Sequence, residues 1–153
     1  LFLPYLGGER TPHNDAAARA QLLHLDHAAD RDAVTRAVLE GVAFALRDSL
    51  DALAGTGTRI ERLIGVGGGT RSLYWLRAVA TALGLPIEVP VAGDFGGAFG
   101  AARLAMMALG APPSIAVAPP IARVVEPDPA LIPAFAASHA RFRAAYAALR
   151  GQP

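Results

Sequence analysis

The sequence contains no cysteine among its 153 residues. Disulfide bonds, thiolate metal sites and cysteine nucleophiles are therefore excluded, and the composition is compatible with the cytoplasmic location that we expect. Long apolar runs are lacking as well, because Arg103 interrupts the best candidate, residues 96–110, before it reaches the roughly 18 residues of a membrane helix. We expect no membrane partner.

An excess of either charge is also lacking. The chain has 14 basic and 13 acidic residues, interspersed along it, and a net charge of +1. Because nucleic acids attract concentrated positive charge, no nucleic-acid partner is expected. Hydrophobic residues make up 53% of the chain, which is ample for the core of about one soluble domain. A small molecule is the expected ligand.

The beginning of the chain differs from that of a complete protein. Leu1 stands in place of an initiator methionine, and no charged segment followed by an apolar one indicates a signal peptide. Two or three strands are expected, which is few for four helices, because helix faces need partners to pack against. We expect a part of a longer protein, whose uncovered faces favour association, for example as a homodimer.

The apolar spacing predicts an alternation of helices and strands. A helix is expected over 30–53, with Asp30 as its N-cap and Gly55 at its end. The next expected elements are a strand at 60–66, a helix at 71–83 that ends at Gly84, and a strand at 86–90. A helix at 94–109 follows, and its small residues permit close approach to the sheet. This order predicts an α/β fold with parallel strands joined by a right-handed crossover.

The last forty residues are predicted to be a surface connection followed by a helix. Residues 111–127 are rich in proline and alanine and contain a short extended piece near 122–126. A helix follows over 128–150, capped by Asp128 and Pro129. Its apolar stripe is interpreted as core. The stripe consists of Phe135, His139, Phe142, Tyr146 and Leu149.

Most patterns that indicate catalysis are missing. The histidines are His13, His24, His27 and His139. They include one pair at i and i+3, but no H-E-x-x-H motif, so no metal site is predicted. No serine lies in a G-x-S-x-G motif, which argues against a serine nucleophile. Only the carboxylates of Glu9 and Asp94 lie beside glycine turns, and Asp94 is interpreted as a helix cap.

Two charged pairs lie four residues apart on the first long helix. They are Arg36 with Glu40, and Arg47 with Asp51. Such pairs are typical of solvent-exposed helix faces, so we interpret both as weak surface ion pairs without a chemical role.

The most informative segment is the glycine turn, Gly67 to Gly69, between an expected strand and an expected helix. Three glycines let the main chain approach a ligand, and the following helix N-terminus offers unpaired N–H groups. The segment lacks the Lys-Ser/Thr of a Walker loop, and Thr70 stands where G-x-G-x-x-G requires its third glycine. From these residues alone, the segment is either a plain tight turn or a ligand site.

Two side chains after the turn have alternative interpretations. The hydroxyl of Ser72 can cap the helix or contact a purine, and the sequence does not separate these roles. The indole of Trp75 can border an adenine, although packing against a neighbouring helix is the more common role of such a residue.

Four stretches, taken in order and spacing, resemble the C-terminal domain of the FGGY family of carbohydrate kinases. They are Phe2–Asp15, Arg36–Asp48, Gly67–Trp75 and Gly97–Ala105. The resemblance covers most of residues 2–110 and is greatest to the xylulokinases. It implies part of a ribonuclease-H-like domain of the actin-like ATPase fold. The expected parts are a cleft loop at 1–15, an α/β core at 16–110, a surface connection at 111–127 and a C-terminal helix at 128–150.

The resemblance also implies a reaction and its participants. Members of the family phosphorylate a sugar hydroxyl with Mg²⁺-bound ATP and an aspartate base. Carried over to this sequence, Gly67, Gly68, Gly69 and Ser72 form the cofactor-binding turn, with Gly68 and Gly69 against the adenosine. The aspartate base is expected upstream of Leu1, in or beside a missing N-terminal kinase domain, and Mg²⁺ is expected to be held by ATP and residues outside this chain. The chain alone is expected to be inactive.

Two positions depart from the family pattern in one local segment. His24 stands where the family usually has glycine, and Ala29 stands where a histidine is common.

The main hypothesis from the resemblance is that the chain is the nucleotide-binding part of a D-xylulose kinase. The alternatives are a family member that acts on another ketose or polyol, and a non-catalytic nucleotide-binding or interaction module.

Overall fold

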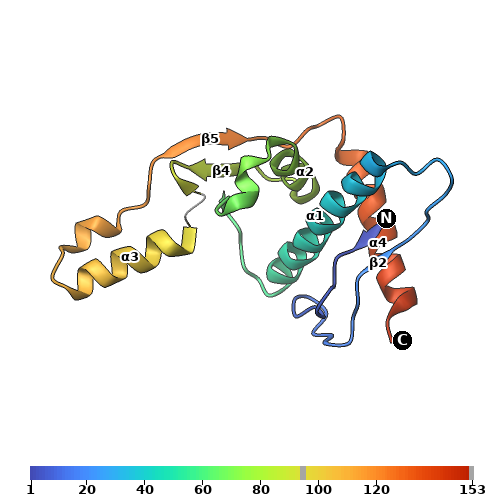
Figure 1. Cartoon of the computed structure of the whole chain (residues 1–153), viewed down its shortest axis with the longest axis horizontal. Coiled ribbons are helices and arrows are strands. Elements are labelled where there is room, and N and C mark those ends of the chain that lie inside the picture. The colour runs from blue at the N-terminus through green and yellow to red at the C-terminus, as the bar shows by residue number, and fades with distance from the viewer. Residues whose placement is uncertain (94–95, 152–153) are drawn as a thin grey trace.

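The computed structural model describes residues 1–93 and 96–151 of the chain. Its body consists of three helices and a small sheet, and a separate helical arm extends from one end (Figure 1). The strands are β1 (Phe2–Leu3), β2 (Gln21–Leu22), β3 (Leu63–Ile64), β4 (Ile87–Pro90) and β5 (Ile121–Val125). The α-helices are α1 (Arg31–Gly55), α2 (Leu73–Leu83), α3 (Gly96–Ala108) and α4 (Ile132–Leu149), and the 3₁₀ helices are η1 (Gly68–Arg71) and η3 (Pro113–Ala116).

The main sheet has the order β3-β4-β5. β3 and β4 are parallel, with α2 between them in the chain, which confirms the predicted parallel pair and its crossover. β3 is shorter than the predicted 60–66, because only Leu63 and Ile64 pair with β4. β5 lies where an extended piece was expected and pairs antiparallel with β4, so the sheet is mixed. The antiparallel pair of β1 with β2 was not predicted.

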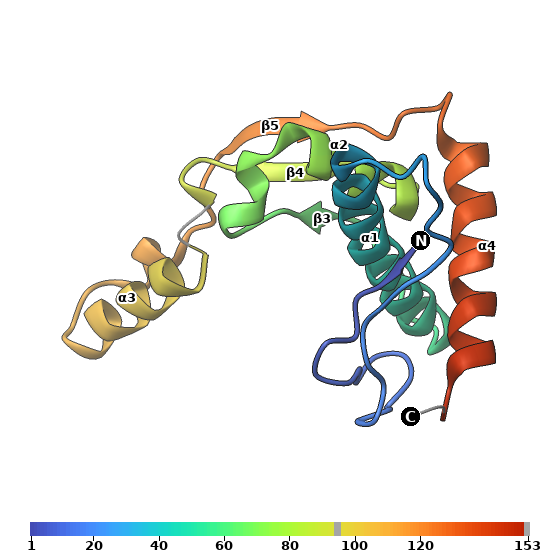
Figure 2. The same ribbon diagram turned by 45° about the vertical axis from the view of Figure 1, so that its right-hand side comes forward.

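The core lies where α1, α2 and α4 meet the first strand. Phe44 of α1 and Phe142 of α4 are buried, and their rings lie 5.8 Å apart. β1 crosses α1 so closely that a Cβ on Gly41 would lie 2.3 Å from the carbonyl oxygen of Phe2. α4 runs along the outer side of this group (Figure 2). Its predicted apolar stripe is confirmed as core, with Tyr146 also buried.

The ends of the helices follow the local sequence in two cases and not in a third. Asp30 caps α1 as predicted, since its Oδ1 accepts a hydrogen bond from the Ala33 N–H at 2.7 Å. α2 ends at Gly84, whose φ of 69° suits glycine. The predicted cap of α4 by Asp128 is wrong. Its carboxylate instead accepts from the Ala130 N–H and forms a turn, and α4 begins three residues later than Pro129.

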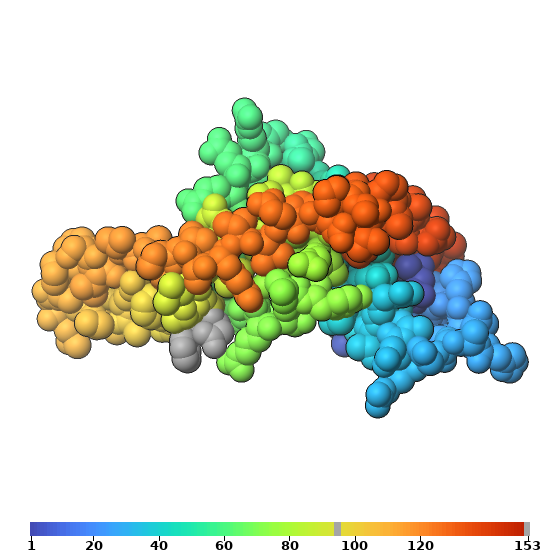
Figure 3. All heavy atoms as spheres, turned by 90° about the horizontal axis from the view of Figure 1, so that it is seen from above, coloured from blue at the N-terminus to red at the C-terminus, as the bar shows by residue number. Residues whose placement is uncertain are grey.

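The predicted packing of the third long helix against the sheet is also wrong. α3 has no buried residue and forms, with η3, the arm at one end of the molecule (Figures 1 and 3). Its N-terminal part borders the sheet, where a Cβ on Gly96 would lie 3.5 Å from the Val66 Cβ, and Phe99 lines a pocket together with Ile64 of β3. Leu104 and Leu109 are 67% and 90% exposed, because the described residues supply no second layer to cover them. Asp94, the predicted start of this helix and its cap, lies outside the described residues.

Arg47 forms hydrogen bonds to α2 in addition to its predicted ion pair with Asp51. Arg47 Nε donates to Asp51 at 2.8 Å, and its Nη1 also donates to the carbonyls of Ala82 and Leu83 at the end of α2. These carbonyls have no partner within their own helix, so Arg47 fastens α2 to α1. The pair of Arg36 with Glu40 is longer, at 3.7 Å, as expected for a weak contact.

No helix in the described part of the chain combines the length and the apolarity that crossing a membrane would require.

The departure of His24 from the family pattern has a conformational consequence. Its φ is 58°, in the left-handed region that an L residue occupies at a cost of about 1 kcal/mol. We predict that His24→Gly raises the free energy of unfolding by about 0.5–1 kcal/mol, after the greater freedom of glycine in the unfolded chain is allowed for. Urea denaturation followed by circular dichroism measures this change.

The matched control is His27→Gly, because His27 is also exposed and has no left-handed φ. It is expected to be neutral or destabilising. Equal effects of the two substitutions would contradict the assignment of strain to His24.

Candidate functional site

The glycine turn lies at the carboxyl ends of β3 and β4. The Gly65 N–H donates to the Glu88 carbonyl, and the Gly67 N–H donates to the Gly93 carbonyl, both at 2.8 Å, so the two strand ends are joined. The chain then enters η1 and α2. Parallel strands of α/β sheets bind ligands at this end, and the structure places the predicted site there.

Gly67 and Gly68 present their backbone to open space. A Cβ at either position would meet no atom of the described residues within 4 Å, and Gly67 has a φ of 92°, which requires glycine. Within residues 1–93 and 96–151, the Gly68 and Gly69 N–H groups form no hydrogen bond. An open backbone with unpaired donors suits an anionic or polar ligand.

Gly69 has a different environment from its two neighbours. A Cβ at Gly69 would lie 2.0 Å from Cζ3 of Trp75, so the indole occupies the space of a side chain. The indole Nε1 donates to the Leu39 carbonyl of α1 at 3.2 Å. Packing against a neighbouring helix, the more common of the two roles considered for Trp75, is therefore confirmed. The proposed contact of Gly69 with adenosine stays a prediction.

Ser72 is a helix cap. Its Oγ accepts a hydrogen bond from the Trp75 N–H at 3.2 Å, and the residue is exposed. The cap uses a lone pair of the hydroxyl and leaves its proton free for a second acceptor, so the ligand contact predicted for Ser72 is compatible with the cap. That contact stays a prediction.

Two residues that hold the turn were missed by sequence reasoning. Thr70 is buried and both its N–H and its Oγ1 donate to the Gly67 carbonyl, at 3.1 and 2.8 Å. Arg123 of β5 donates from Nη2 to the Thr70 carbonyl. A threonine after the glycines was visible in the sequence, whereas nothing local links it to a residue 53 positions away.

The polar loop before Asp15 is fixed by contacts with α4. The Tyr146 hydroxyl donates to Asp15 Oδ2 at 2.9 Å, and the Asp15 Oδ1 accepts from the N–H groups of Ala17 and Ala18. The hydrogen bond from Tyr146 is the main reason that the pKa of Asp15 lies below its usual range. His13 stacks on Tyr146 with ring centroids 3.7 Å apart.

His13 is further held by Tyr5. Its Nε2 lies 3.0 Å from the Tyr5 hydroxyl, and burial lowers the pKa of the imidazole. Burial also raises the pKa of Tyr5, and the charge of Asp48 adds to this shift. The neutral imidazole is therefore the form that this packing favours. Glu9, the other loop carboxylate singled out in the sequence, accepts from the Thr11 N–H at 3.0 Å.

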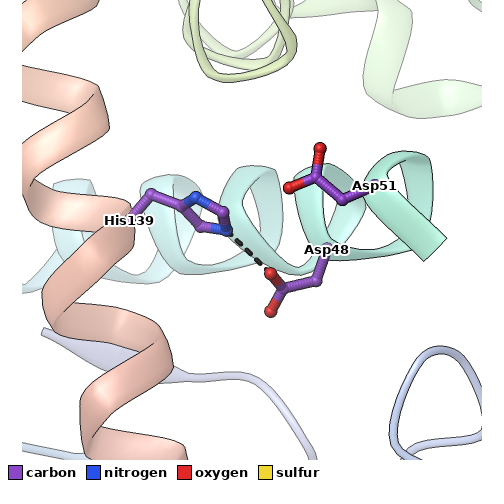
Figure 4. A group of neighbouring side chains, drawn as sticks. All are labelled: Asp48, Asp51 and His139. Carbon is purple, nitrogen blue, oxygen red and sulfur yellow. Dashed lines mark hydrogen bonds and ion pairs between the residues drawn. The ribbon is translucent and has the colours of Figure 1, made fainter. Parts of the chain in front are cut away.

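A second polar group lies between α1 and α4, away from the turn (Figure 4). Asp48, Asp51 and His139 each offer a ligand atom within 4.8 Å of the others, a grouping that the sequence spacing did not reveal. Asp48 is 4% exposed, its Oδ1 lies 2.8 Å from His139 Nε2, and its Oδ2 has no hydrogen-bond partner.

We interpret this group as ion pairing between the helices. Arg143 Nε lies 3.6 Å from Asp48 Oδ1, and Arg47 binds Asp51. Two guanidinium groups thus neutralise the two carboxylates, which leaves little net negative charge to attract a cation. His139 was predicted to be core, and it fills that place between the helices with its ring against Phe44.

These features define an α/β fold with an exposed glycine turn at the ends of its parallel strands. The model of the FGGY family of carbohydrate kinases, C-terminal domain, matches residues 1–109. The chain belongs to this family, and the resemblance seen in the sequence is confirmed.

A curated relative and two solved structures are similar to the chain. The xylulose kinase of Escherichia coli (strain K12) is 44% identical over 107 residues, which are 70% of this chain and 22% of that protein. A crystal structure of a xyloylose kinase from Brucella ovis has a TM-score of 0.86 and 55% identity, and the match covers 99% of this chain and 32% of that one. The xylulose kinase structure from Rhodospirillum rubrum has a TM-score of 0.77 and 29% identity, covering 97% and 30%.

The chain thus spans about a fifth of the length of the curated relative and about a third of each solved chain. Its fold is part of the actin-like ATPase fold of these kinases, as the resemblance implied.

The environments of the glycines generate a test. We predict that Gly69→Ala lowers the free energy of unfolding by about 1–3 kcal/mol, because the new methyl group overlaps the Trp75 indole. Gly68→Ala is the matched control and is expected to change stability by less than about 0.5 kcal/mol, since its methyl group meets open space. Denaturation midpoints measure both. A larger loss for Gly68→Ala than for Gly69→Ala would show that the turn is packed differently.

Proposed function

We propose that this chain is the nucleotide-binding C-terminal part of an ATP-dependent sugar kinase that phosphorylates D-xylulose. The observation that carries the proposal is the open backbone of Gly67 and Gly68 at the strand ends, in a chain of the FGGY family. The choice of D-xylulose is supported by the names of the similar proteins from E. coli and R. rubrum, which are xylulose kinases.

The proposed role of the chain is to hold ATP. Phosphoryl transfer depends mostly on positioning and on charge stabilisation, so a rigid platform for the nucleotide contributes to catalysis without a reacting side chain. Gly67, Gly68 and Gly69 supply the backbone of this platform, and Ser72 supplies a hydroxyl at its edge. The aspartate base of the family would come from a preceding kinase domain, which would also carry most of the sugar site.

Mg²⁺ would accompany ATP. The chemistry of the Asp48, Asp51 and His139 group does not suit it, because arginines already pair with both carboxylates and the group lies between α1 and α4. We therefore propose that the ion is held by the phosphates and by groups outside this chain.

The loop from Glu9 to Asp15 would form one wall of the cleft. The fixed conformation of the loop supports this, because a wall that orders a substrate must itself be held in place. Tyr146 of α4 holds Asp15, and Tyr5 holds His13. Association of two copies remains a prediction.

The complete gene product containing this chain tests the proposed function. We predict that it transfers phosphate from ATP to D-xylulose, and that the 153-residue chain alone gives no turnover, because the base and the sugar site are missing. A coupled ADP-release assay over a panel of ketoses and polyols measures this. Turnover restricted to another ketose or polyol would correct the substrate. Absence of turnover on every sugar would overturn the kinase proposal in favour of a binding module.

A further inference from the structure

The glycine turn needs support from outside itself. Three successive glycines lose more conformational freedom on ordering than other residues do, so their backbone has little stiffness of its own. Thr70 provides two of the hydrogen bonds that hold the turn, because its N–H and its Oγ1 both donate to the Gly67 carbonyl. Thr70 therefore helps to fix the open backbone at Gly67 and Gly68.

Thr70 is in turn held by β5. The Arg123 side chain donates from Nη2 to the Thr70 carbonyl at the junction of η1 with α2. A hydrogen bond from a charged donor is among the stronger ones in proteins, and it satisfies a carbonyl of a buried residue.

The geometry of β5 directs this side chain to the turn. Arg123 lies two residues before Val125, so both side chains point to the same face of the sheet. Val125 is buried there, and α2 contacts β5 on that face. A β-bulge lies next to Arg123. Val89 pairs with Arg123 but Pro90 pairs with Ile121, so Ala122 is an extra residue in β5. Such bulges often re-aim side chains beside functional sites.

We infer that Arg123 is a positioning residue for the nucleotide, which acts through Thr70 to preorganise the glycine turn; this rests on the proposed function. Arg123 lies beyond residue 109, where the match to the family model ends. The strand that carries it, β5, lies alongside β4 at the edge of the sheet (Figure 1). Without this contact, bound ATP must order the turn itself, which weakens binding.

Steady-state kinetics of the complete gene product test this inference. Arg123→Met keeps the length of the side chain and removes its donors. We expect the KM for ATP to rise about 3- to 10-fold, since part of a charged hydrogen bond is lost from nucleotide binding. The kcat and the KM for the sugar are expected to stay within about 2-fold, because bound ATP reorders the turn. Arg123→Lys retains one donor and is expected to lie between the wild type and Arg123→Met.

The matched control is Arg62→Met, because Arg62 pairs with Glu88 on the same sheet and does not contact the turn. It is expected to leave all three constants unchanged. If Arg123→Met does not fold, the test compares Arg123→Lys with Arg62→Lys. The KM for ATP is then expected to rise about 2-fold or more in Arg123→Lys and to stay unchanged in Arg62→Lys.

The outcomes separate the two proposals. If the wild type turns over normally and Arg123→Met has an unchanged KM for ATP, the positioning role is overturned and the proposed function stands. Parallel losses in kcat and in both KM values would assign Arg123 a merely structural role and also overturn the inference. A wild type that does not use ATP would overturn both.

Discussion

The Gly69 end of the glycine turn is fixed by one close contact, between the Gly69 backbone and the Trp75 indole. No other residue fits at position 69, because any side chain would begin 2.0 Å from the ring. The same indole donates to the Leu39 carbonyl, so the turn is fixed relative to α1 as well as to its own sheet. Ser72 further orients Trp75, because it caps the helix on which Trp75 lies. Gly69 thus packs against Trp75, whereas Gly67 and Gly68 are open among the described residues.

α1 is the element through which the separate parts of the chain are joined. On one side, Arg47 holds the end of α2, and on the other, Asp48 meets His139 of α4. β1 crosses it at Gly41 with no room for a side chain. A helix that contacts α2, the N-terminal strand and the last helix provides a rigid base, which a site built on backbone atoms requires. The arm of α3, in contrast, stands apart from this base (Figure 1).

Local signals in the sequence were sufficient for the elements around the turn. Asp30 and Gly84 marked the ends of helices, because capping and left-handed ends are decided within one turn of chain. The apolar stripe of α4 identified core for the same reason. The start of α4 was predicted wrongly. The Asp128 carboxylate could accept a hydrogen bond as a helix N-cap or within a turn, and in the structure it accepts from the Ala130 N–H within a turn. Small residues in α3 indicated close packing, but they do not say whether a partner is present.

Contacts between distant segments could not be predicted from a single sequence. The contact of Tyr146 with Asp15 joins residues 131 positions apart, and that of Arg123 with Thr70 joins residues 53 apart. Periodicity and motifs describe neighbours in the chain, so they identified the open glycines and Ser72 but not the groups that hold them. The grouping of Asp48 with His139 escaped notice for the same reason. Its two members lie on different helices, 91 positions apart.

The most direct measurement of the central claim is the KM for ATP of the complete gene product carrying Gly68→Val. The Cβ of the new side chain would meet no atom of the described residues within 4 Å, but the side chain would stand where the nucleotide is proposed to lie. We expect the KM for ATP to rise about 5- to 100-fold and the KM for the sugar to stay unchanged. No change is expected for Gly55→Val, an equally open position at the end of α1. An unchanged KM for ATP in Gly68→Val would contradict the claim that nucleotide binds at this turn.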